Sequence, residues 1–252
     1  MNKYIDQHMH SSFSIDSFTS IEEYLNTTCG KIITTEHIDF DCVVDNGRDA
    51  LFDYEKYVKE IERLKNIYGD RILKGVEIGY EKTAKERISK YLLDKEFDLL
   101  LLSVHQGDGI DYMWPLERDE FLKILPIYYE QVLESIEVFH EHFDIVAHLD
   151  FILRNKDYSM EDIYPHEERL VAILEAIKKY DLQLELNTRG LFKFENVEYY
   201  DYLFNLYRDL GGKKISIGSD AHITAHYKLG FDEAIDFVKG HGLEIANIKD
   251  EL

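Results

Sequence analysis

The sequence is poor in cysteine and contains no long apolar run. Its two cysteines, Cys29 and Cys42, form no C-x-x-C pair, which excludes a disulfide framework and favours a reducing cytosol. The first residues, Met1–Asp6, lack the apolar core of a signal peptide. The longest apolar stretches, such as Leu99–Leu102, have the length of a strand and are too short to span a membrane. These absences predict a cytoplasmic protein with no membrane partner.

Basic residues are also scarce. Lys and Arg total 29 against 50 Asp and Glu, which gives a formal net charge of −21. Nucleic acids and anionic membranes require a basic surface, so neither is expected as a partner. A small anionic substrate is still compatible with this charge if bound metal cations reverse the local field.

Linkers and nucleotide-binding motifs are absent as well. No Gly/Ser-rich linker, repeat or low-complexity run divides the 252 residues, of which 45% are apolar. We therefore expect a single domain over residues 1–252. No Gly-x-Gly-x-x-Gly follows a strand-like segment, and no Gly-x-x-x-x-Gly-Lys-Ser/Thr occurs, so neither a dinucleotide site nor a P-loop is predicted.

Short β-like runs alternate with longer amphipathic segments along the chain. The predicted strands are Tyr4–Met9, Lys31–Thr35, Ile72–Ile78, Phe97–Val104, Ile145–His148, Leu182–Asn187 and Lys214–Gly218, and a further short strand is allowed at Leu243–Ala246. The predicted helices are Ile21–Thr28, Leu51–Ile67, Ala84–Leu93, Phe121–Phe139 (with Pro126 bending it or marking its first turn), His166–Lys179, Tyr199–Leu210 and Phe231–Lys239. Seven strands that are each followed by a helix predict an α/β protein with a parallel sheet, closed or nearly closed into a β/α barrel.

Metal-ligand residue types follow the predicted strands where each one ends. They are His8, His10, His37, Glu77, His105, His148, Asp220 and His222. The carboxyl ends of the strands form the active-site face of a β/α barrel, so these side chains should converge. His8 and His10 are two residues apart on a strand and therefore point to the same side.

Imidazole and carboxylate ligands suit Zn²⁺, Mn²⁺ and Fe²⁺, and Glu77 is the candidate to bridge two ions. A lone histidine at a strand end is more often a hydrogen-bonded structural residue. Six such histidines on five strands favour a metal cluster over that alternative. The five remaining histidines are expected to be structural or on the surface; they are His140, His142, His166, His226 and His241.

This ordered set of motifs, from His8-Met9-His10 to Ser219-Asp220-Ala221-His222, resembles the PHP (polymerase and histidinol phosphatase) family. The resemblance implies a distorted (β/α)7 TIM-like barrel with two to three divalent metal ions at the carboxyl ends of its strands. It assigns one metal to His8, His10, Glu77 and Asp220, a second to Glu77, His105 and His148, and a third to Asp16, His37 and His222. Many members have histidine at the position of Asp16, and the alternative for this aspartate is an N-cap of the next helix.

Among stand-alone members, the length and two arginines resemble the L-histidinol-phosphate phosphatases. The resemblance suggests that Arg154 and Arg189 hold a phosphate, although each could instead form a surface salt bridge. The loop from Gln106 to Leu116 could cover the pocket. Its acids, together with Glu117, could meet an amine or imidazolium, and Trp114 is either a substrate contact or a loop anchor.

The expected reaction is hydrolysis of a small phosphomonoester, foremost L-histidinol phosphate, by a metal-bridging hydroxide that attacks phosphorus. Glu77, Asp16 and Asp220 are the carboxylates expected to take part in catalysis. Another PHP-type phosphoesterase is the nearest alternative. An amidohydrolase is disfavoured, because many of those enzymes use a carboxylated lysine at the end of the fourth strand, where this sequence has His105. A non-catalytic binding module is disfavoured because all nine ligand positions are retained.

Overall fold

The computed structural model describes residues 4–247. Most of its strands belong to one mixed sheet in the order β10-β9-β8-β7-β4-β3-β1-β2, in which only β2 runs antiparallel to its neighbour. These strands are β1 (Ile32–Cys42), β2 (Arg48–Leu51), β3 (Ile72–Gly79), β4 (Leu99–Ser103), β7 (Ile145–Val146), β8 (Gln183–Asn187), β9 (Lys214–Gly218) and β10 (Glu244–Ile245). A separate hairpin pairs β5 (Gln106–Gly107) with β6 (Ile110–Asp111).

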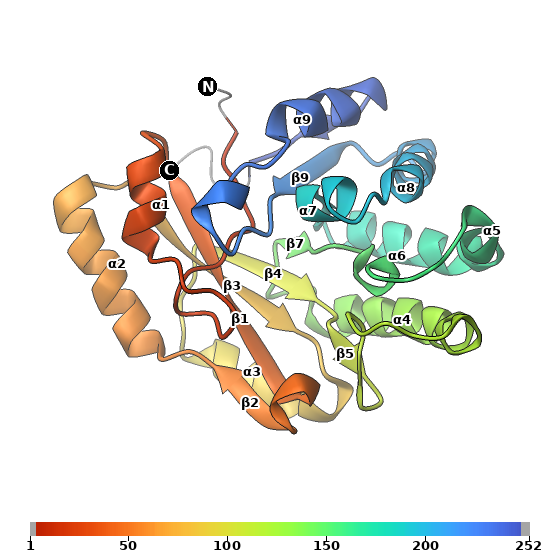
Figure 1. Cartoon of the computed structure of the whole chain (residues 1–252), viewed down its shortest axis with the longest axis horizontal. Helices are drawn as coiled ribbons and strands as arrows, with labels where there is room; N and C mark the ends of the chain where they lie inside the picture. Colours follow the sequence, from red (N-terminus) through yellow and green to blue (C-terminus); the bar gives the residue numbers. More distant parts are fainter. Residues whose placement is uncertain (1–3, 248–252) are drawn as a thin grey trace.

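Helices connect these strands and cover the outer side of the sheet (Figure 1). They are α1 (Ile21–Thr27), α2 (Tyr54–Tyr68), α3 (Lys85–Leu93), α4 (Arg118–Phe139), α5 (Met160–Ile163), α6 (Glu167–Lys179), α7 (Thr188–Phe192), α8 (Val197–Asp209) and α9 (Phe231–Gly240). Local sequence explains where several of them begin. Ser20 and Glu23 form a capping box before α1, and the Asp53 side chain accepts the Lys56 amide at the start of α2.

The predicted α/β class and parallel barrel-like sheet are confirmed, but the regular strands do not close into a ring. The expected first strand, Tyr4–Met9, is irregular. It lies between β9 and β1, with the Gln7 amide donating to the Ile217 carbonyl at 3.2 Å and the Thr35 amide donating to the Met9 carbonyl at 2.7 Å. This segment therefore joins the two sides of the distorted barrel without adding a regular ladder.

Other elements also differ from the sequence prediction. The strand expected to end at Thr35 continues to Cys42, because it pairs with β3 on one side and with the unpredicted β2 on the other. His37 therefore lies within a strand and not after it. Pro126 lies inside α4 and not in its first turn, since this helix begins at Arg118.

The interior of the barrel changes from apolar to polar along the strands. Side chains alternate between the two faces of a strand, so Ile33 and His37 share one face of β1, and Leu73 and Glu77 share one face of β3. An apolar cluster fills the amino end of the interior, comprising Ile5, Ile33, Leu73, Leu99, Leu101, Ile145 and Ala147. The ligand-type residues lie above this cluster, at the carboxyl end. The larger core packs the opposite face of the sheet against the helices.

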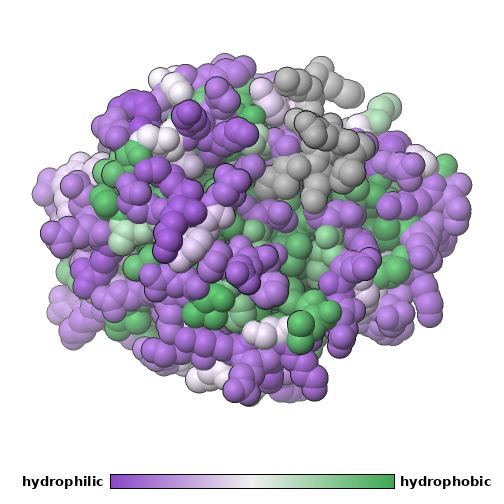
Figure 2. All heavy atoms as spheres, turned by 180° about the vertical axis from the view of Figure 1, so that it is seen from behind, coloured by the Kyte–Doolittle hydropathy of each residue, from purple (hydrophilic) through white to green (hydrophobic). Residues whose placement is uncertain are grey.

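Figure 2 shows one face on which hydrophilic side chains surround small apolar groups. No helix among the described residues is both long and apolar enough to cross a membrane.

Candidate metal centre

Glu77 lies at the centre of the ligand-type residues and is fully buried. Its two carboxylate oxygens face different histidines. Oε1 lies 2.7 Å from His148 Nε2 and 3.2 Å from His105 Nε2. Oε2 lies 2.9 Å from His37 Nδ1, 3.3 Å from His8 Nε2 and 3.5 Å from His10 Nε2. This arrangement is the one that a bridging carboxylate would need, with a separate set of imidazoles around each oxygen.

A second carboxylate, Asp220, continues the cluster on the other side of His10. Its Oδ1 lies 3.5 Å from His10 Nε2 and 3.6 Å from His222 Nδ1. His222 in turn places Nε2 2.9 Å from Asp16 Oδ2, and Asp16 Oδ1 lies 3.7 Å from His37 Nε2. The structure therefore brings all nine predicted ligand positions into one continuous cluster, including the divergent Asp16.

Four triplets within this cluster place one donor atom each within 4.8 Å of the others. They are His10–His37–His222, His8–His10–Asp220, His8–Glu77–His148 and His37–Glu77–His105. The triplets overlap and group His148 with His8, whereas the family resemblance groups His148 with His105. The geometry therefore supports a multinuclear site without selecting one partition of the ligands.

Unpaired polar atoms in this cluster fit the presence of cations. His8 Nε2 and His10 Nε2 lie 3.1 Å apart, although two imidazole nitrogens that both carry protons repel each other. Glu77 Oε2 and His37 Nδ1 face each other at 2.9 Å without hydrogen-bond geometry, and His148 Nδ1 is buried without a hydrogen-bond partner among the described residues. Buried polar atoms without partners are costly, and a metal ion would satisfy the Glu77 and His37 atoms.

The charges of the isolated protein also suit metal binding. Burial alone would raise the pKa of Glu77, but the imidazoles of His8 and His105 hold it well below its usual range. Asp220 behaves in the same way: burial opposes ionisation, and Arg189 and His10 lower its pKa strongly. Burial and the neighbouring His37 lower the pKa of His10, so its imidazole is neutral and can act as a ligand.

Buried carboxylates outside the cluster fix the loops that carry it. Glu36 accepts hydrogen bonds from the hydroxyls of Ser11 and Ser14 at 2.5 and 2.6 Å, which holds the loop that contains Asp16. Asp6 accepts the Ser219 amide and hydroxyl next to Asp220, whose φ of 52° lies in the left-handed region. These contacts place Asp16 and Asp220 although neither lies on a regular strand.

Both predicted arginines approach the cluster, and they converge on Asp220. Arg154 Nη1 lies 3.0 Å from Asp220 Oδ2, and Arg189 Nη1 lies 3.4 Å from Asp220 Oδ1. Arg154 is only 1% exposed, so the alternative of a surface salt bridge is wrong for this residue. Arg154 Nη2 and Arg189 Nε are buried without a partner among the described residues. These two nitrogens could donate to an anion.

A cavity of about 190 Å³ opens over the cluster. Both arginines, Asp16 and several of the histidines line it, together with Asp39, Asp111, Met113 and Phe151. Trp114 and Glu117, the predicted substrate contacts, are not among the lining residues: Trp114 is 44% exposed and Glu117 is the N-cap of α4. The β5–β6 hairpin instead turns Asp111 and Met113 to the cavity. The sequence therefore predicted the correct loop and its acidic residues as a cover of the pocket, but it did not predict Met113 as a lining residue.

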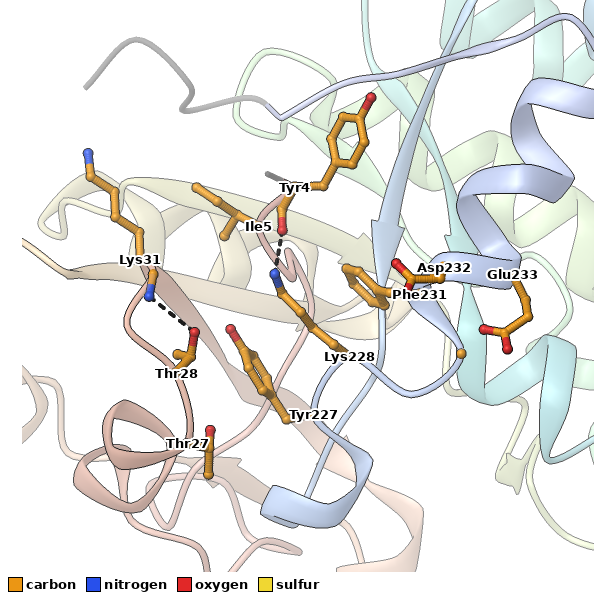
Figure 3. Close-up of a pocket in the computed structure, with 12 residues that line it drawn as sticks. Tyr4, Ile5, Thr27, Thr28, Lys31, Tyr227, Lys228, Phe231, Asp232 and Glu233 are labelled. Carbon is orange, nitrogen blue, oxygen red and sulfur yellow. Dashed lines mark hydrogen bonds between the residues drawn. The ribbon is translucent and has the colours of Figure 1, made fainter. Parts of the chain in front are cut away.

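A larger hollow of about 480 Å³ lies beside the amino end of β1 (Figure 3). The Lys228 ammonium extends across it to the Tyr4 carbonyl, and Tyr227 and Phe231 form part of its wall. Its lining contains no histidine. The hollow is therefore separate from the ligand cluster.

The histidines expected to be structural take no part in the metal-type triplets of the described residues. His140 stacks on Tyr180 with ring centroids 3.7 Å apart, and His241 lies 3.0 Å from Asp201. The sequence did not identify Asp39 and Glu185, which hydrogen-bond the outer nitrogens of His105 and His8. For Asp39 the only sequence signal is its position two residues after His37 on the same strand, and for Glu185 it is a charged residue within a predicted strand.

Fold and site together define a barrel-like α/β protein with a cluster of metal-ligand residue types at the carboxyl ends of its strands. The chain belongs to the PHP domain family, since the sequence model of that family matches residues 6–189. Asp220 and His222 lie beyond the matched segment.

Similar proteins agree with this assignment. A probable histidinol-phosphatase from Clostridium acetobutylicum is 34% identical over 247 residues, covering 95% of this chain and 94% of that protein. A histidinol-phosphatase from Lactococcus lactis subsp. lactis is 29% identical over 256 residues, covering 95% of this chain and 92% of that protein. The crystal structure of histidinol phosphate phosphatase from Lactococcus lactis subsp. lactis Il1403, in complex with Zn, L-histidinol and phosphate, superposes with a TM-score of 0.82. It shares 28% identity and covers 97% of this chain and 96% of that one.

Proposed function

We propose that this protein is a metal-dependent phosphomonoester hydrolase that converts L-histidinol phosphate to L-histidinol and phosphate, a step of histidine biosynthesis. The observation that carries the proposal is the convergence of a nine-residue ligand cluster and two arginines on one cavity. The substrate assignment is supported by the names of the relatives and by the ligands of the similar crystal structure.

The donor set fits two to three divalent ions, and Zn²⁺, Mn²⁺ and Fe²⁺ all accept imidazole and carboxylate ligands. We propose His8, His10, Asp16, His37, Glu77, His105, His148, Asp220 and His222 as the ligands. Metal ions bound there would lower the pKa of a bound water and neutralise phosphate oxygens.

The carboxylates of the centre are ligands in this proposal and not proton donors. The pKa of Glu77 and that of Asp220 lie well below their usual ranges, so both are ionised at neutral pH. For Asp16, burial opposes ionisation, but His37 and His222 lower the pKa. An ionised carboxylate binds a cation strongly and has no proton to give to a leaving alcohol.

The lining of the cavity offers contacts to both parts of the proposed substrate. Arg154 and Arg189 line the cavity and offer guanidinium groups to the phosphate. At the β5–β6 hairpin, Asp111 and Met113 offer a carboxylate and an apolar contact to the amino-imidazole part. No Lys, Arg or His nitrogen of the described residues lies within ion-pair distance of Asp111. The nearby Lys156 ammonium interacts with it electrostatically but donates its hydrogen bonds to the carbonyls of Tyr112 and Arg154.

A panel of phosphate esters tests the substrate assignment. The purified protein, supplied in turn with Zn²⁺, Mn²⁺ and Fe²⁺, is assayed for phosphate release from L-histidinol phosphate, a nucleoside monophosphate, phosphotyrosine and p-nitrophenyl phosphate. We expect the highest kcat/KM with L-histidinol phosphate. A higher value with phosphotyrosine or the nucleotide would assign the protein to another phosphoesterase activity, and binding without turnover of every ester would identify a binding module.

A further inference from the structure

Glu185 is a buried carboxylate that contacts the metal-type cluster from outside. It lies on β8 and is 1% exposed. Its Oε1 accepts from His8 Nδ1 at 2.7 Å, and its Oε2 accepts from the His148 amide at 2.8 Å. An ionised carboxylate can only accept, so Nδ1 of His8 carries a proton, and Nε2 faces Glu77 and His10.

Asp39 makes the same contact with a different ligand. Its Oδ1 accepts from His105 Nδ1 at 2.8 Å, while His105 Nε2 lies 3.2 Å from Glu77. Asp39 is two residues after His37 on β1, so the two side chains share one face of the strand. Each of the two carboxylates therefore binds Nδ1 of one histidine, the nitrogen that points away from the cluster. This contact directs Nε2 of the same histidine towards Glu77.

Glycines provide the space that these two carboxylates occupy. A Cβ atom at Gly79 would overlap the Asp39 carboxylate, and Asp39 and Gly79 are directly paired residues in the β1–β3 ladder. A Cβ atom at Gly218 would overlap Glu185 Oε1 and His8 Cβ. Neither glycine has a positive φ, so backbone conformation does not explain why these positions lack a side chain.

The arginine that lies over the cluster is held in the same way. Asp150 accepts from Arg154 Nε at 3.3 Å and from the Tyr200 hydroxyl at 2.7 Å. A Cβ atom at Gly190 would overlap the Asp150 carboxylate. The same combination of a carboxylate and a facing glycine therefore occurs at three separate places around the site.

We propose that Asp39 and Glu185 are positioning residues of the metal centre, and that Gly79 and Gly218 are required because they leave these carboxylates room to bind His105 and His8. This proposal rests on the proposed metal centre but not on the identity of the substrate. Partners of this kind on the outer nitrogen of a metal-bound histidine typically change metal affinity by ~10- to 100-fold.

Metal binding is the direct test, measured as Zn²⁺ affinity by competition with a chelating dye in the absence of substrate. We expect Asp39→Ala, Glu185→Gln, Gly79→Ala and Gly218→Ala each to weaken binding of at least one ion by ~10- to 100-fold. Gly240→Ala is the matched control, because a Cβ atom there meets nothing within 4 Å. Circular dichroism identifies any variant that fails to fold. The Asp39 side chain is 13% exposed, against 1% for Glu185, so Asp39→Ala should disturb the core less than Glu185→Gln.

A double-mutant cycle separates this role from a merely structural one. If Gly79 is needed only to make room for Asp39, then Gly79→Ala should weaken Zn²⁺ binding in the native background but not further in the Asp39→Ala background. Native Zn²⁺ affinity in both Asp39→Ala and Glu185→Gln would overturn the proposal, as would additive losses in the cycle. A protein that binds Zn²⁺ as expected but does not hydrolyse L-histidinol phosphate would contradict the proposed function and leave this inference standing.

Discussion

The Arg154 guanidinium lies 3.0 Å from the Asp220 carboxylate, and the side chains of both residues are almost completely buried. Asp220 also faces His10 at 3.5 Å, so one carboxylate is shared between an arginine and the metal-type cluster. In the proposed function, the binding of phosphate by Arg154 and the binding of a metal ion by Asp220 would therefore be coupled through this ion pair. Arg189 touches the same carboxylate but is more exposed, which makes it the cleaner residue for testing anion binding.

Replacement of Arg189 should weaken use of the phosphate without loss of metal. We predict that Arg189→Ala lowers kcat/KM by ~10- to 1,000-fold, or about 1.4–4 kcal/mol, because the planar guanidinium fork is lost. Metal content, measured by elemental analysis, should stay native. A native rate at sub-saturating substrate would show that Arg189 has no part in the site.

Arg154→Ala should lower kcat/KM over the same range, but with a cost in stability as well. Removal of Arg154 leaves the buried Asp150 without a cationic partner and Asp220 with Arg189 alone, and the loss of one partner of a buried ion pair costs ~3–5 kcal/mol. Thermal unfolding of the metal-free protein measures this cost. Unchanged stability together with unchanged kcat/KM would contradict both roles.

Glu77→Gln should remove metal and activity together. Glu77 is the carboxylate whose two oxygens face separate groups of histidines, and an amide lacks both the charge and the second acceptor oxygen. His140→Gln, which alters a histidine stacked on Tyr180 away from the cluster, is the control and should retain native metal content. A Glu77→Gln protein with native metal content and turnover would place Glu77 in a structural role.

Metal affinity should increase with pH well beyond the ordinary range of histidine. In the metal-free protein burial opposes the charge, but Glu77 and Asp16 raise the pKa of His37 to about 9. A metal ion must displace this proton, so affinity should rise as the pH increases from about 6.5, the unperturbed histidine value, towards 9. Calorimetry in buffers of different ionisation enthalpy counts the protons released on binding. Affinity that is constant between these two pH values would contradict the assignment of His37 as a ligand.

Asp111 should discriminate between esters that carry a cationic group and esters that do not. We predict that Asp111→Asn lowers kcat/KM for L-histidinol phosphate by ~10-fold, close to 1.4 kcal/mol, and leaves p-nitrophenyl phosphate nearly unaffected. Asp108→Asn on the exposed turn of the same hairpin is the control, since asparagine tolerates the left-handed φ of 50° found there. Equal effects on both esters would show that Asp111 does not recognise the cationic end.

The sequence predicted most of the fold because strand and helix periodicities are local. His8, His10, Glu77 and His148 were identified because ligand types at several strand ends must converge in a barrel. The sequence did not predict β2 or the irregular form of the Tyr4–Met9 segment, since both depend on which neighbours the chain meets in the folded protein.

Contacts between strands that are far apart in the sequence could not be predicted either, because local sequence patterns carry no information about them. Asp39 and Glu185 bind histidines that are 66 and 177 residues away in the sequence. The facing glycines carry no side chain that could indicate a function. For the same reason the exposed Trp114 was a plausible substrate contact in the sequence, while the folded hairpin turns Met113 to the cavity instead.

The most direct test of the central claim is phosphate release from L-histidinol phosphate before and after metal removal. The protein is treated with a chelator, its metal content is measured, and Zn²⁺, Mn²⁺ or Fe²⁺ is returned in stoichiometric steps. We predict that hydrolysis disappears with the metal and returns as two to three ions bind per chain. Full hydrolysis by protein shown to be free of metal would contradict the account.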